Sequence, residues 1–330
     1  MKVGKLSEST LSKYVLKKVN NVRPEVIVGA GIGEDCTALK IADDEIIVMS
    51  TDPITGTAKD IGSLGVYITA NDIACSGAEI IGIMLTILLP DRTKENELSA
   101  IMNDVNSACQ ALNIQVIGGH TEVTTAVSRP VVSVTGVGKV KEDKLLRSGQ
   151  VKPGMDIIMT KAIGLEGTSI IAKEKESELL THFPESLIDK AKSFDKELLI
   201  MKEAMLIRDK AAALHDVTEG GIYGALWELA EASNVGLDID LKKIRVRQET
   251  IEICEYVKIN PYKLISSGCL IIAGYDGNGI VDTLTQSGID AVVIGKATDS
   301  NDRRLLNGED IRFLETPDKD ELYKVIGGRD

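Results

Sequence analysis

Apolar residues recur along this chain with helical spacing in some segments and as short continuous runs in others. Leu11, Val15 and Val19 share one helical face, so the pattern predicts a helix over 8–19. The run 80–89 is apolar almost throughout and predicts a buried strand. Strands are also expected at 37–41, 45–51, 114–117, 131–140, 157–160, 211–214, 237–239, 269–272 and 291–294. Helices are also expected at 61–75, 95–112, 166–173, 187–207, 222–233 and 279–286.

Strands and helices alternate on both sides of a break near 148–154, where charges, a proline and a glycine interrupt the pattern. A chain of 330 residues has room for two domains and a large core. We therefore expect an α+β fold of two domains, residues 1–150 and residues 151–330. In the first domain, Gly62 and Gly65 weaken a predicted helix but would let another backbone pack closely against it.

The composition limits which binding partners and which cellular locations are expected. The net charge is −12, and a chain this acidic is not expected to bind nucleic acid, whose phosphates it would repel. The sequence has no apolar run near the roughly 18 residues of a membrane span, and its charged start, 1–12, does not resemble a signal peptide. Five cysteines without metal-type spacing fit reduced thiols, so a cytoplasmic location is expected. For Cys36 and Cys75, a buried free thiol is favoured over covalent catalysis. The segment 317–330 is charged.

The segment 215–221 places two carboxylates and a glycine pair at the predicted start of a helix. Asp216 and Glu219 suit a metal or phosphate site there, although a simple helix cap by Asp216 or Thr218 also explains these residues. A cap does not explain the glycine pair 220–221, because each glycine in a first turn costs about 1 kcal/mol relative to alanine. Close approach of a ligand or of another backbone would account for the pair.

Three further acidic patches lie beside small or glycine-rich turns. A dinucleotide-binding fingerprint is rejected for 29–35, because the alternating segment after it predicts a strand and not a helix. This loop suits phosphates, with Asp35 facing Mg²⁺, or else is a glycine-rich surface turn. Asp52 follows a predicted strand and either points into a site or starts a turn. Asn71 and Asp72 lie in a small-residue helix, either exposed or partly buried beside a cation.

Another cluster, 118–122, follows a predicted strand. His120 is a candidate acid, base or phosphate contact, and Glu122 is a candidate metal ligand. A lone histidine after a strand is more often a structural hydrogen bonder. A zinc site is not expected, because His182 and His215 lack ligand spacing with His120.

Taken in order, these segments resemble the aminoimidazole ribonucleotide (AIR) synthase superfamily. The superfamily includes AIR synthase, formylglycinamidine ribonucleotide synthetase, thiamine-monophosphate kinase, selenophosphate synthetase and the hydrogenase maturation factor HypE. The chain is most similar to HypE-like members. The segments that carry the resemblance are Gly31 to Ala38, Thr51 to Pro53, Asn71 to Ala78, Gly118 to Glu122, Gly164 to Thr168, Asp216 to Gly221 and Ser266 to Leu270.

The resemblance implies that each half is an α+β domain, the C-terminal one an α/β sandwich. The N-terminal sheets of two copies would pair into a barrel-like homodimer, with ATP near the interface. It also implies the residues of an ATP and Mg²⁺ site. The implied metal ligands are Asp35, Asp52, Asp72 and Asp216; the implied nucleotide contacts are Gly31, Gly33, Asn71, Gly119, Thr218 and Gly220; the candidate catalytic groups are His120 and Glu219.

The chain departs from the patterns of named members at functional positions. HypE-type proteins end in a cysteine that is carbamoylated and then dehydrated, whereas the last cysteine here is Cys269, so cyanide synthesis on its own tail is not expected. HypE also tends to carry an acid and a lysine where this chain has His120 and Glu122. Selenophosphate synthetase needs an N-terminal reactive cysteine, but the first cysteine here is Cys36. Thiamine-phosphate kinase has an aspartate at the position of His120.

The sequence therefore favours an ATP- and Mg²⁺-dependent, HypE-like enzyme. It would transfer a phosphoryl group to an amide-type or phosphate-type oxygen, as in an ATP-dependent dehydration or cyclisation. Two alternatives stay open: a nucleotide-binding regulatory protein without catalysis, and a hydrogenase-maturation accessory that acts on a partner protein. The expected partners are a second copy of the chain and either a small-molecule substrate or a maturation protein.

Overall fold

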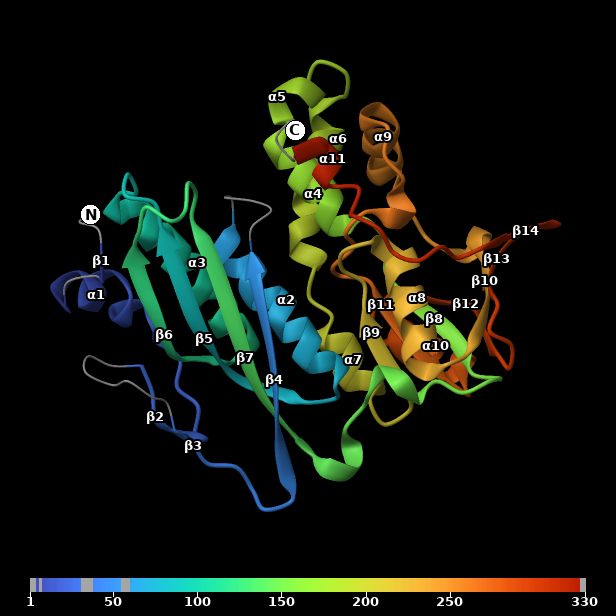
Figure 1. The fold of residues 1–330 in the computed structure, drawn as a ribbon, viewed down its shortest axis with the longest axis horizontal. Coiled ribbons are helices and arrows are strands. Elements are labelled where there is room, and N and C mark those ends of the chain that lie inside the picture. The colour runs from blue at the N-terminus through green and yellow to red at the C-terminus, as the bar shows by residue number, and fades with distance from the viewer. Residues whose placement is uncertain (1–3, 6–7, 31–37, 55–59, 327–330) are drawn as a thin grey trace. The chain divides into compact units, whose positions relative to one another are not determined.

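The structure is a computed structural model that describes residues 4–5, 8–30, 38–54 and 60–326. The chain divides into two compact units, Met1–Leu145 and Leu146–Asp330, which we call unit 1 and unit 2. Each unit contains a β-sheet and helices, which confirms the expected α+β class (Figure 1). Among the helices of the described ranges, none is both long and apolar enough to cross a membrane.

Unit 1 is built around a five-stranded sheet with the order β1-β6-β5-β7-β4. Its strands are β1 (Gly4–Lys5), β4 (Glu45–Ile54), β5 (Glu79–Leu89), β6 (Gln115–Val123) and β7 (Val131–Lys141). The other elements are α1 (Glu8–Tyr14), α2 (Ile61–Cys75), α3 (Glu95–Leu112), and the paired strands β2 (Val26–Val28) and β3 (Ala38–Leu39). β5 and β6 run parallel, and the other strand pairs in the described part of this sheet are antiparallel. The sheet remains open at β4, so the described part of unit 1 does not close into a barrel by itself.

Helix α2 packs closely on its neighbours because two of its residues lack a Cβ. A Cβ at Gly62 would lie 2.5 Å from the Ile101 carbonyl oxygen of α3. A Cβ at Gly65 would lie 2.8 Å from Val134 Cγ2 of β7. The inference that these glycines permit close packing is confirmed, and it explains why helix propensity is given up at both positions.

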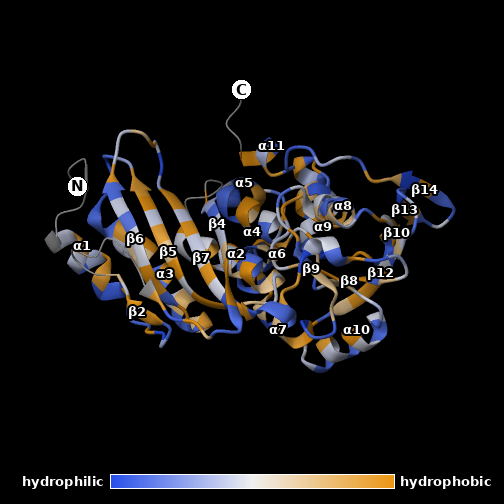
Figure 2. Cartoon of the chain, turned by 60° about the horizontal axis from the view of Figure 1, so that its bottom comes forward, coloured by the Kyte–Doolittle hydropathy of each residue, from blue (hydrophilic) through white to orange (hydrophobic). Residues whose placement is uncertain are grey.

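The sheet of unit 1 has two unequal faces. Along β4, residues alternate between half-buried and exposed, and Ile54 on the half-buried side packs against Gly65 of α2. The opposite face presents Ile47 and Met49, which are 40% and 60% exposed. Figure 2 shows apolar and polar bands side by side on β5, β6 and β7 of this sheet. One face is therefore covered by α2, and the other, which we call the uncovered face, presents apolar side chains to solvent.

Unit 2 contains a seven-stranded sheet with the order β14-β13-β10-β12-β8-β11-β9, in which β10 and β13 are parallel. Its strands are β8 (Asp156–Thr160), β9 (Ala213–Asp216), β10 (Gly236–Asp240), β11 (Leu270–Gly274), β12 (Ala291–Thr298), β13 (Arg303–Asn307) and β14 (Asp310–Phe313). Its helices are α4 (Leu165–Glu174), α5 (Glu176–Leu179), α6 (Glu185–Lys192), α7 (Met201–Ile207), α8 (Gly221–Ser233), α9 (Gln248–Val257), α10 (Gly277–Gln286) and α11 (Tyr323–Ile326).

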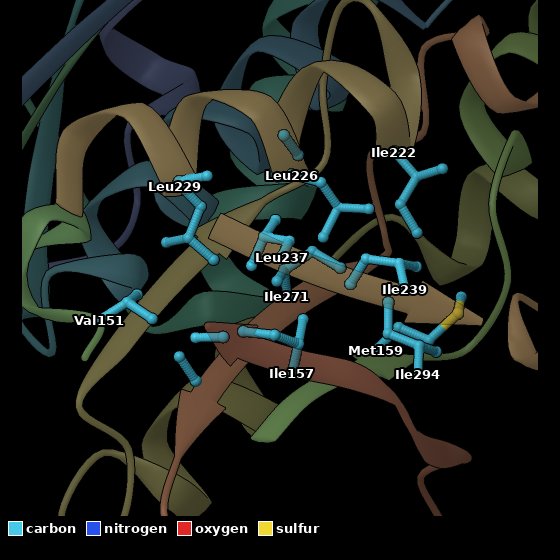
Figure 3. Packing of buried hydrophobic residues seen from close by; sticks show 14 of the residues in the cluster. Val151, Ile157, Met159, Ile222, Leu226, Leu229, Leu237, Ile239, Ile271 and Ile294 are labelled. Carbon is cyan, nitrogen blue, oxygen red and sulfur yellow. The ribbon is translucent and has the colours of Figure 1, made fainter. Parts of the chain in front are cut away.

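The main core of unit 2 lies between α8 and the sheet. Ile222, Leu226 and Leu229 of α8 point toward side chains of β8, β10 and β11 (Figure 3). Every residue of β11 is buried, so both faces of this strand are covered. A second apolar cluster joins α4, α6 and α9, and Leu322 belongs to it at 3% exposure. The charged segment that follows Pro317 thus contributes to a core.

Two predicted helices are broken in the structure. The helix expected over 8–19 ends at Tyr14 and continues as a short 3₁₀ turn, Leu16–Lys18. The helix expected over 187–207 is interrupted between α6 and α7. There, Lys161 Nζ donates hydrogen bonds to the carbonyl oxygens of Glu197 (2.9 Å) and Leu199 (2.6 Å), so these carbonyls bond a distant lysine instead of a helix ladder. The expected elements also omitted β13, β14 and α9.

Candidate functional site

Two carboxylates of unit 1, one from β4 and one from α2, converge on a single hydroxyl. Ser50 Oγ donates a hydrogen bond to Asp72 Oδ2 and lies 3.5 Å from Asp52 Oδ2. Ser50 and Asp52 are two residues apart on β4, so they lie on the same face of the sheet, the one that α2 covers. The structure therefore brings together Asp52 and Asp72, which the sequence analysis singled out separately.

Asp52 lies inside a strand and does not follow one. The strand expected at 45–51 continues to Ile54, and Asp52 pairs with Val134 of β7. Pro53 is tolerated because β4 is an edge strand, where proline's missing N–H is acceptable. The interpretation of Asp52 as the start of a turn is wrong, and its carboxylate is held by a regular ladder.

The height of α2 above the sheet places Asp72 beside β4. A Cβ at Gly136 of β7 would lie 2.6 Å from Thr69 Cγ2, and a Cβ at Gly138 would lie 2.5 Å from Ile73 Cγ2. These two glycines let α2 approach the sheet along the turn of helix that ends with Asp72. Asn71 is fully buried and Asp72 is half-buried, so the alternative of an exposed helix face is wrong for this pair.

His120 and Glu122 lie on the other side of the same sheet. The expected strand 114–117 extends to Val123 as β6, so the cluster 118–122 is part of a strand and does not follow one. His120 Nε2 lies 3.1 Å from Glu122 Oε2, and the His120 side chain is 47% exposed. Because Thr121 is buried and alternates with these two residues, both point to the uncovered face. Within one copy of unit 1, His120 thus points away from the face of Asp52.

Gly119 is explained by strand packing. Its φ of +149° and the distance of 2.2 Å that a Cβ would have from the Leu85 carbonyl oxygen both exclude a side chain there. A nucleotide contact at this position remains a prediction. The predicted residues Gly31, Gly33 and Asp35 lie outside the described ranges.

In unit 2, Asp216 is the last residue of β9, an edge strand, and pairs with Leu270 of β11. Asp216 is 8% exposed. The chain then turns through Thr218, whose carbonyl accepts from the Gly221 N–H at 3.1 Å, and enters α8. We call residues 216–221 the acidic turn. The N-cap of α8 is Gly220 at φ +80°, without a side-chain cap bond, so the interpretation of Asp216 or Thr218 as a simple helix cap is wrong.

The glycine pair of the acidic turn has a backbone explanation. Gly221 has φ +61°, and a Cβ there would lie 2.6 Å from the Tyr262 carbonyl oxygen and 2.8 Å from that of Leu264. Another stretch of main chain therefore passes where a side chain would be. Of the two explanations that the sequence left open for this pair, the approach of another backbone is confirmed at Gly221.

A segment far along the chain holds the acidic turn. Asp320 Oδ2 accepts from the Gly220 N–H at 2.8 Å, and Asp320 Oδ1 accepts from the Leu322 N–H at 2.8 Å. The Tyr323 hydroxyl donates to Glu219 Oε1 at 2.5 Å. Two residues of the turn are thus bonded to side chains about a hundred positions downstream. The Gly220 N–H already donates to Asp320. We therefore expect Gly220 to contribute to a ligand site through its backbone conformation and not through this N–H group.

Two carboxylates, Glu166 and Asp320, lie behind this turn, and the pKa of each is raised. Burial raises the pKa of Glu166 to about 7, with smaller contributions from Asp320 and Glu219 in the same direction and with Ser267 opposing them. Glu166 is 2% exposed, and its Oε2 has no hydrogen-bond partner. Burial also raises the pKa of Asp320, against the backbone N–H groups that bond it. The hydrogen bond to Glu219 is the main cause that raises the pKa of Tyr323 to about 12.

Two of the predicted metal ligands, Asp52 and Asp72, lie together in the described part of unit 1. Within the described ranges, no group of three or more His, Cys, Asp or Glu side chains is arranged to hold a metal ion. The pair formed by Asp52 and Asp72 in unit 1 is the one convergence that the structure shows among these predicted ligands, and Asp216 belongs to unit 2.

Three of the described cysteines are buried in surroundings that disfavour a thiolate. Cys75, Cys109, Cys254 and Cys269 are not joined in disulfides. Burial raises the pKa of Cys109, Cys254 and Cys269 to about 12, which disfavours the reactive thiolate. Cys36 lies outside the described ranges and Cys75 is half-buried, so the expectation of a buried thiol at these two positions stays a prediction.

Sequence reasoning missed several residues that complete these clusters. Ser50 carried a usable signal, because it alternates with Asp52 on one strand face. Glu166 also carried one, since it follows Gly164 in the first turn of a helix. Asp320 and Tyr323 carried none: they lie in a charged segment that resembles a solvated tail.

Comparison with known proteins gives the same family for both units. Residues 33–140 match the family model described as AIR synthase related protein, N-terminal domain. Residues 152–306 match the model described as AIR synthase related protein, C-terminal domain. A protein of Methanocaldococcus jannaschii, whose name assigns it to hydrogenase expression and formation, is 27% identical over 303 residues, which cover 89% of this chain and 88% of that protein. The carbamoyl dehydratase HypE of Rhizobium leguminosarum bv. viciae is 26% identical over 255 residues, which cover 72% of this chain and 68% of that protein.

Solved structures share the fold. The hydrogenase maturation protein HypE in complex with ATP superposes with a TM-score of 0.81 at 18% identity, covering 98% of this chain and 97% of that chain. A chain of the HypE–HypF complex gives a TM-score of 0.71 at 20% identity, covering 82% of this chain and 90% of that chain. At these identities the likeness is one of fold.

Proposed function

This chain belongs to the AIR synthase-related family and is HypE-like, and from that premise we propose that it is an enzyme that uses ATP with Mg²⁺. It would activate an amide-type or phosphate-type oxygen by phosphoryl transfer. Two comparisons support the proposal. Its relatives include a carbamoyl dehydratase, and its fold is that of a HypE whose structure was solved with ATP. We assign nucleotide binding and dimerisation mainly to unit 1, and we propose that unit 2 supplies the acidic turn and shapes the acceptor pocket.

The convergence of Asp52 and Asp72 on Ser50 is the observation that carries this proposal. Carboxylate and hydroxyl oxygens are the ligands that Mg²⁺ prefers, and the two side chains come from a strand and a helix that are closely packed together. When bound, Mg²⁺ would neutralise charge on the transferred phosphoryl group. We propose that Asp52 and Asp72 hold the metal, with Asn71 beside them, and that Asp35 and Asp216 complete the set.

The acidic turn supplies the second part of the proposed site. Asp216 ends an edge strand, and Glu219 is exposed and fixed by the Tyr323 hydroxyl. A fixed, exposed carboxylate is suited to orient a substrate group or accept its proton. We therefore keep Glu219 as a proposed catalytic group, with Thr218 and Gly220 shaping the turn toward the nucleotide.

A titration with Mg-ATP tests the proposal. We expect the wild-type chain to bind ATP in a Mg²⁺-dependent way by isothermal calorimetry, and to turn ATP over when a suitable acceptor is present. Asp52→Asn and Asp72→Asn should each weaken the binding by about tenfold or more, because each removes a charged oxygen ligand. Binding that is equally tight with and without Mg²⁺, or unaffected by both variants, would contradict the proposed site.

Asp44→Asn is the matched control for this titration. Asp44 precedes β4, is 63% exposed in its side chain and pairs with Lys141 at 2.9 Å. Exposed pairs of this kind contribute little, so the variant should leave the affinity for Mg-ATP within about twofold of wild type. Tight Mg-ATP binding without turnover against any acceptor would instead favour a nucleotide-binding protein without catalysis.

We also propose that two copies pair through the uncovered face of unit 1. Met49 is 60% exposed and Ile47 is 40% exposed on that face, at the open edge of the sheet. Large apolar side chains on a strand face are commonly covered by a partner. His120 and Glu122 point to this same face, so in the homodimer they would lie near the interface. A monomeric mass in light scattering at micromolar concentration would contradict this pairing.

A role on a partner protein is the second candidate. One structure with this fold was solved as a HypE–HypF complex. The acceptor group would then be presented by a maturation protein and not by a free small molecule. Co-purification of the chain with hydrogenase-maturation proteins would support this role, and ATP turnover on a small acceptor with no such complex would count against it.

A further inference from the structure

Residues 315–326 pass over the acidic turn as a continuous segment, which we call the strap. Lys263 Nζ pairs with Glu315 Oε2 at 3.1 Å, and the Glu321 N–H donates to the Lys263 carbonyl at 3.3 Å. The side chain of Pro317 lies near Gly220, at 3.9 Å from the position of a Cβ there. The strap therefore runs along the chain next to Lys263 and reaches the turn from that side.

The strap is anchored by its apolar residues. Leu322 is 3% exposed and belongs to the apolar cluster of α4, α6 and α9, and Val325 and Ile326 pack against that cluster. Burial of these side chains stabilises the segment because it removes apolar surface from water. The anchor makes the strap a stable part of unit 2, although it lies beyond residues 152–306, which the family model matches.

Asp320 is where the strap bonds the turn. Its two oxygens accept from the N–H groups of Gly220 and Leu322 at 2.8 Å each, and the backbone at Ile265 bonds it as well. A carboxylate that is 3% exposed is costly to bury, and backbone donors offset that cost only while this geometry holds. One carboxylate thus ties three separate stretches of main chain to one arrangement.

Resting on the proposed function, we propose that Asp320 and Tyr323 are positioning residues for the nucleotide site. Asp320 fixes the backbone of the acidic turn at Gly220, and Tyr323 fixes the side chain of Glu219. The two residues act at different levels, because one holds main chain and the other holds a carboxylate. Removing Asp320 should loosen the whole turn, whereas removing the Tyr323 hydroxyl should release Glu219 alone.

Amide hydrogen exchange and ATP kinetics on the full chain separate these roles. For Asp320→Ala we expect exchange across residues 217–221 to become about tenfold faster without ligand, and the Kd for Mg-ATP to rise about tenfold, since a hydrogen bond to a charged group is lost. For Tyr323→Phe we expect unchanged exchange and an unchanged KM for ATP, with kcat lowered about threefold. Glu315→Gln, a strap carboxylate that is 79% exposed, is the matched control and should change neither measurement.

Each outcome decides one part. A folded Asp320→Ala protein with wild-type exchange at 217–221 overturns the role of Asp320, and an equal change in kcat and KM for Tyr323→Phe overturns that of Tyr323. If Asp320→Ala does not fold, Asp320→Asn, which keeps one acceptor oxygen, should show intermediate exchange, and wild-type exchange in it overturns the role. If the wild-type chain fails to bind Mg-ATP, the proposed function is overturned and the kinetic role falls with it, while the exchange result still decides whether Asp320 sets the turn.

Discussion

The two units hold carboxylates in opposite electrostatic surroundings. In unit 1, Glu25 lies 2.9 Å from Arg23 and 3.1 Å from Lys139, and its hydrogen bond from Arg23 is the main cause that lowers its pKa to about 2. In unit 2, burial raises the pKa of Glu166 to about 7, and no cation is among the groups that shift it. The first carboxylate is matched by positive charge, whereas the groups that shift the second are two carboxylates and a serine.

This difference separates a structural ion pair from a candidate functional site. A buried acid with matched cations holds its neighbours and has no charge left for a ligand. Acids gathered without cations, around a turn that is fixed by main-chain bonds, retain unmet demand for positive charge, and such groups concentrate at functional sites. We therefore expect unit 1 to depend on charge pairs around Glu25, and unit 2 to depend on backbone geometry around the acidic turn.

Gly221→Ala should produce the largest effect. The new Cβ would meet the Tyr262 and Leu264 carbonyl oxygens at 2.6 and 2.8 Å and would hold φ +61° at a residue with a side chain. We expect a loss of about 3 kcal/mol in the free energy of unfolding, measured by chemical denaturation. Gly288→Ala is the matched control, because Gly288 has φ +79° and open space around it, and it should lose only about 1 kcal/mol. Equal losses in both variants would show that backbone packing does not hold the turn.

Glu166→Gln should remove a pH dependence. The pKa of Glu166 in the folded chain, about 7, lies above its ordinary value of 4.5, so the folded form keeps a proton that the unfolded chain releases between these values. The free energy of unfolding should therefore fall as the pH rises from 4.5 to 7, and the variant should lack this contribution. At pH 8 we expect Glu166→Gln to be more stable than wild type by about 2 kcal/mol, and at pH 4 to be close to it. A variant less stable than wild type at pH 8 would contradict an unmatched Glu166.

Glu25→Gln should lower the free energy of unfolding at neutral pH, opposite to Glu166→Gln, and by the smallest amount of the three variants. The pKa of Glu25 in the folded chain, about 2, lies below its ordinary value of 4.5, so its stabilisation is present above pH 4.5 and is lost as the pH falls toward 2. We expect the variant to lose about 1 kcal/mol at pH 7, because solvent weakens this pair. The loss should shrink toward zero near pH 2 when the two proteins are compared in urea titrations. A gain in stability at pH 7 would place Glu25 in the same class as Glu166.

Much of the fold could be predicted from the sequence, because long segments with a clear apolar period form the elements that their period indicates. The helices at α3 and α8 and the strand β5 are examples. The exceptions have physical causes. The helix expected over 187–207 breaks where Lys161 bonds its carbonyl oxygens. Strand β14 has only four residues, so its alternation of polar and apolar residues is too short to identify a strand.

The candidate site was predictable in its residue types and not in its geometry. Asp52, Asp72 and His120 all stand out as polar residues in apolar surroundings, but only strand register shows that His120 faces away from the side on which Asp52 and Asp72 meet. Asp320 is one of many acids in a charged segment. Its burial depends on Leu322 and its neighbours reaching an apolar cluster from far along the chain, which no local pattern encodes.

The bond between Gly220 and Asp320 also has a consequence for the order in which the protein matures. The two residues are 100 positions apart, and synthesis proceeds from the N-terminus. A nascent chain that has emerged from the ribosome only as far as α8 contains the acids of the turn but not Asp320, which fixes the turn. The acidic turn can take its final form only after residue 320 has emerged, so a partly made chain cannot yet present it to a ligand.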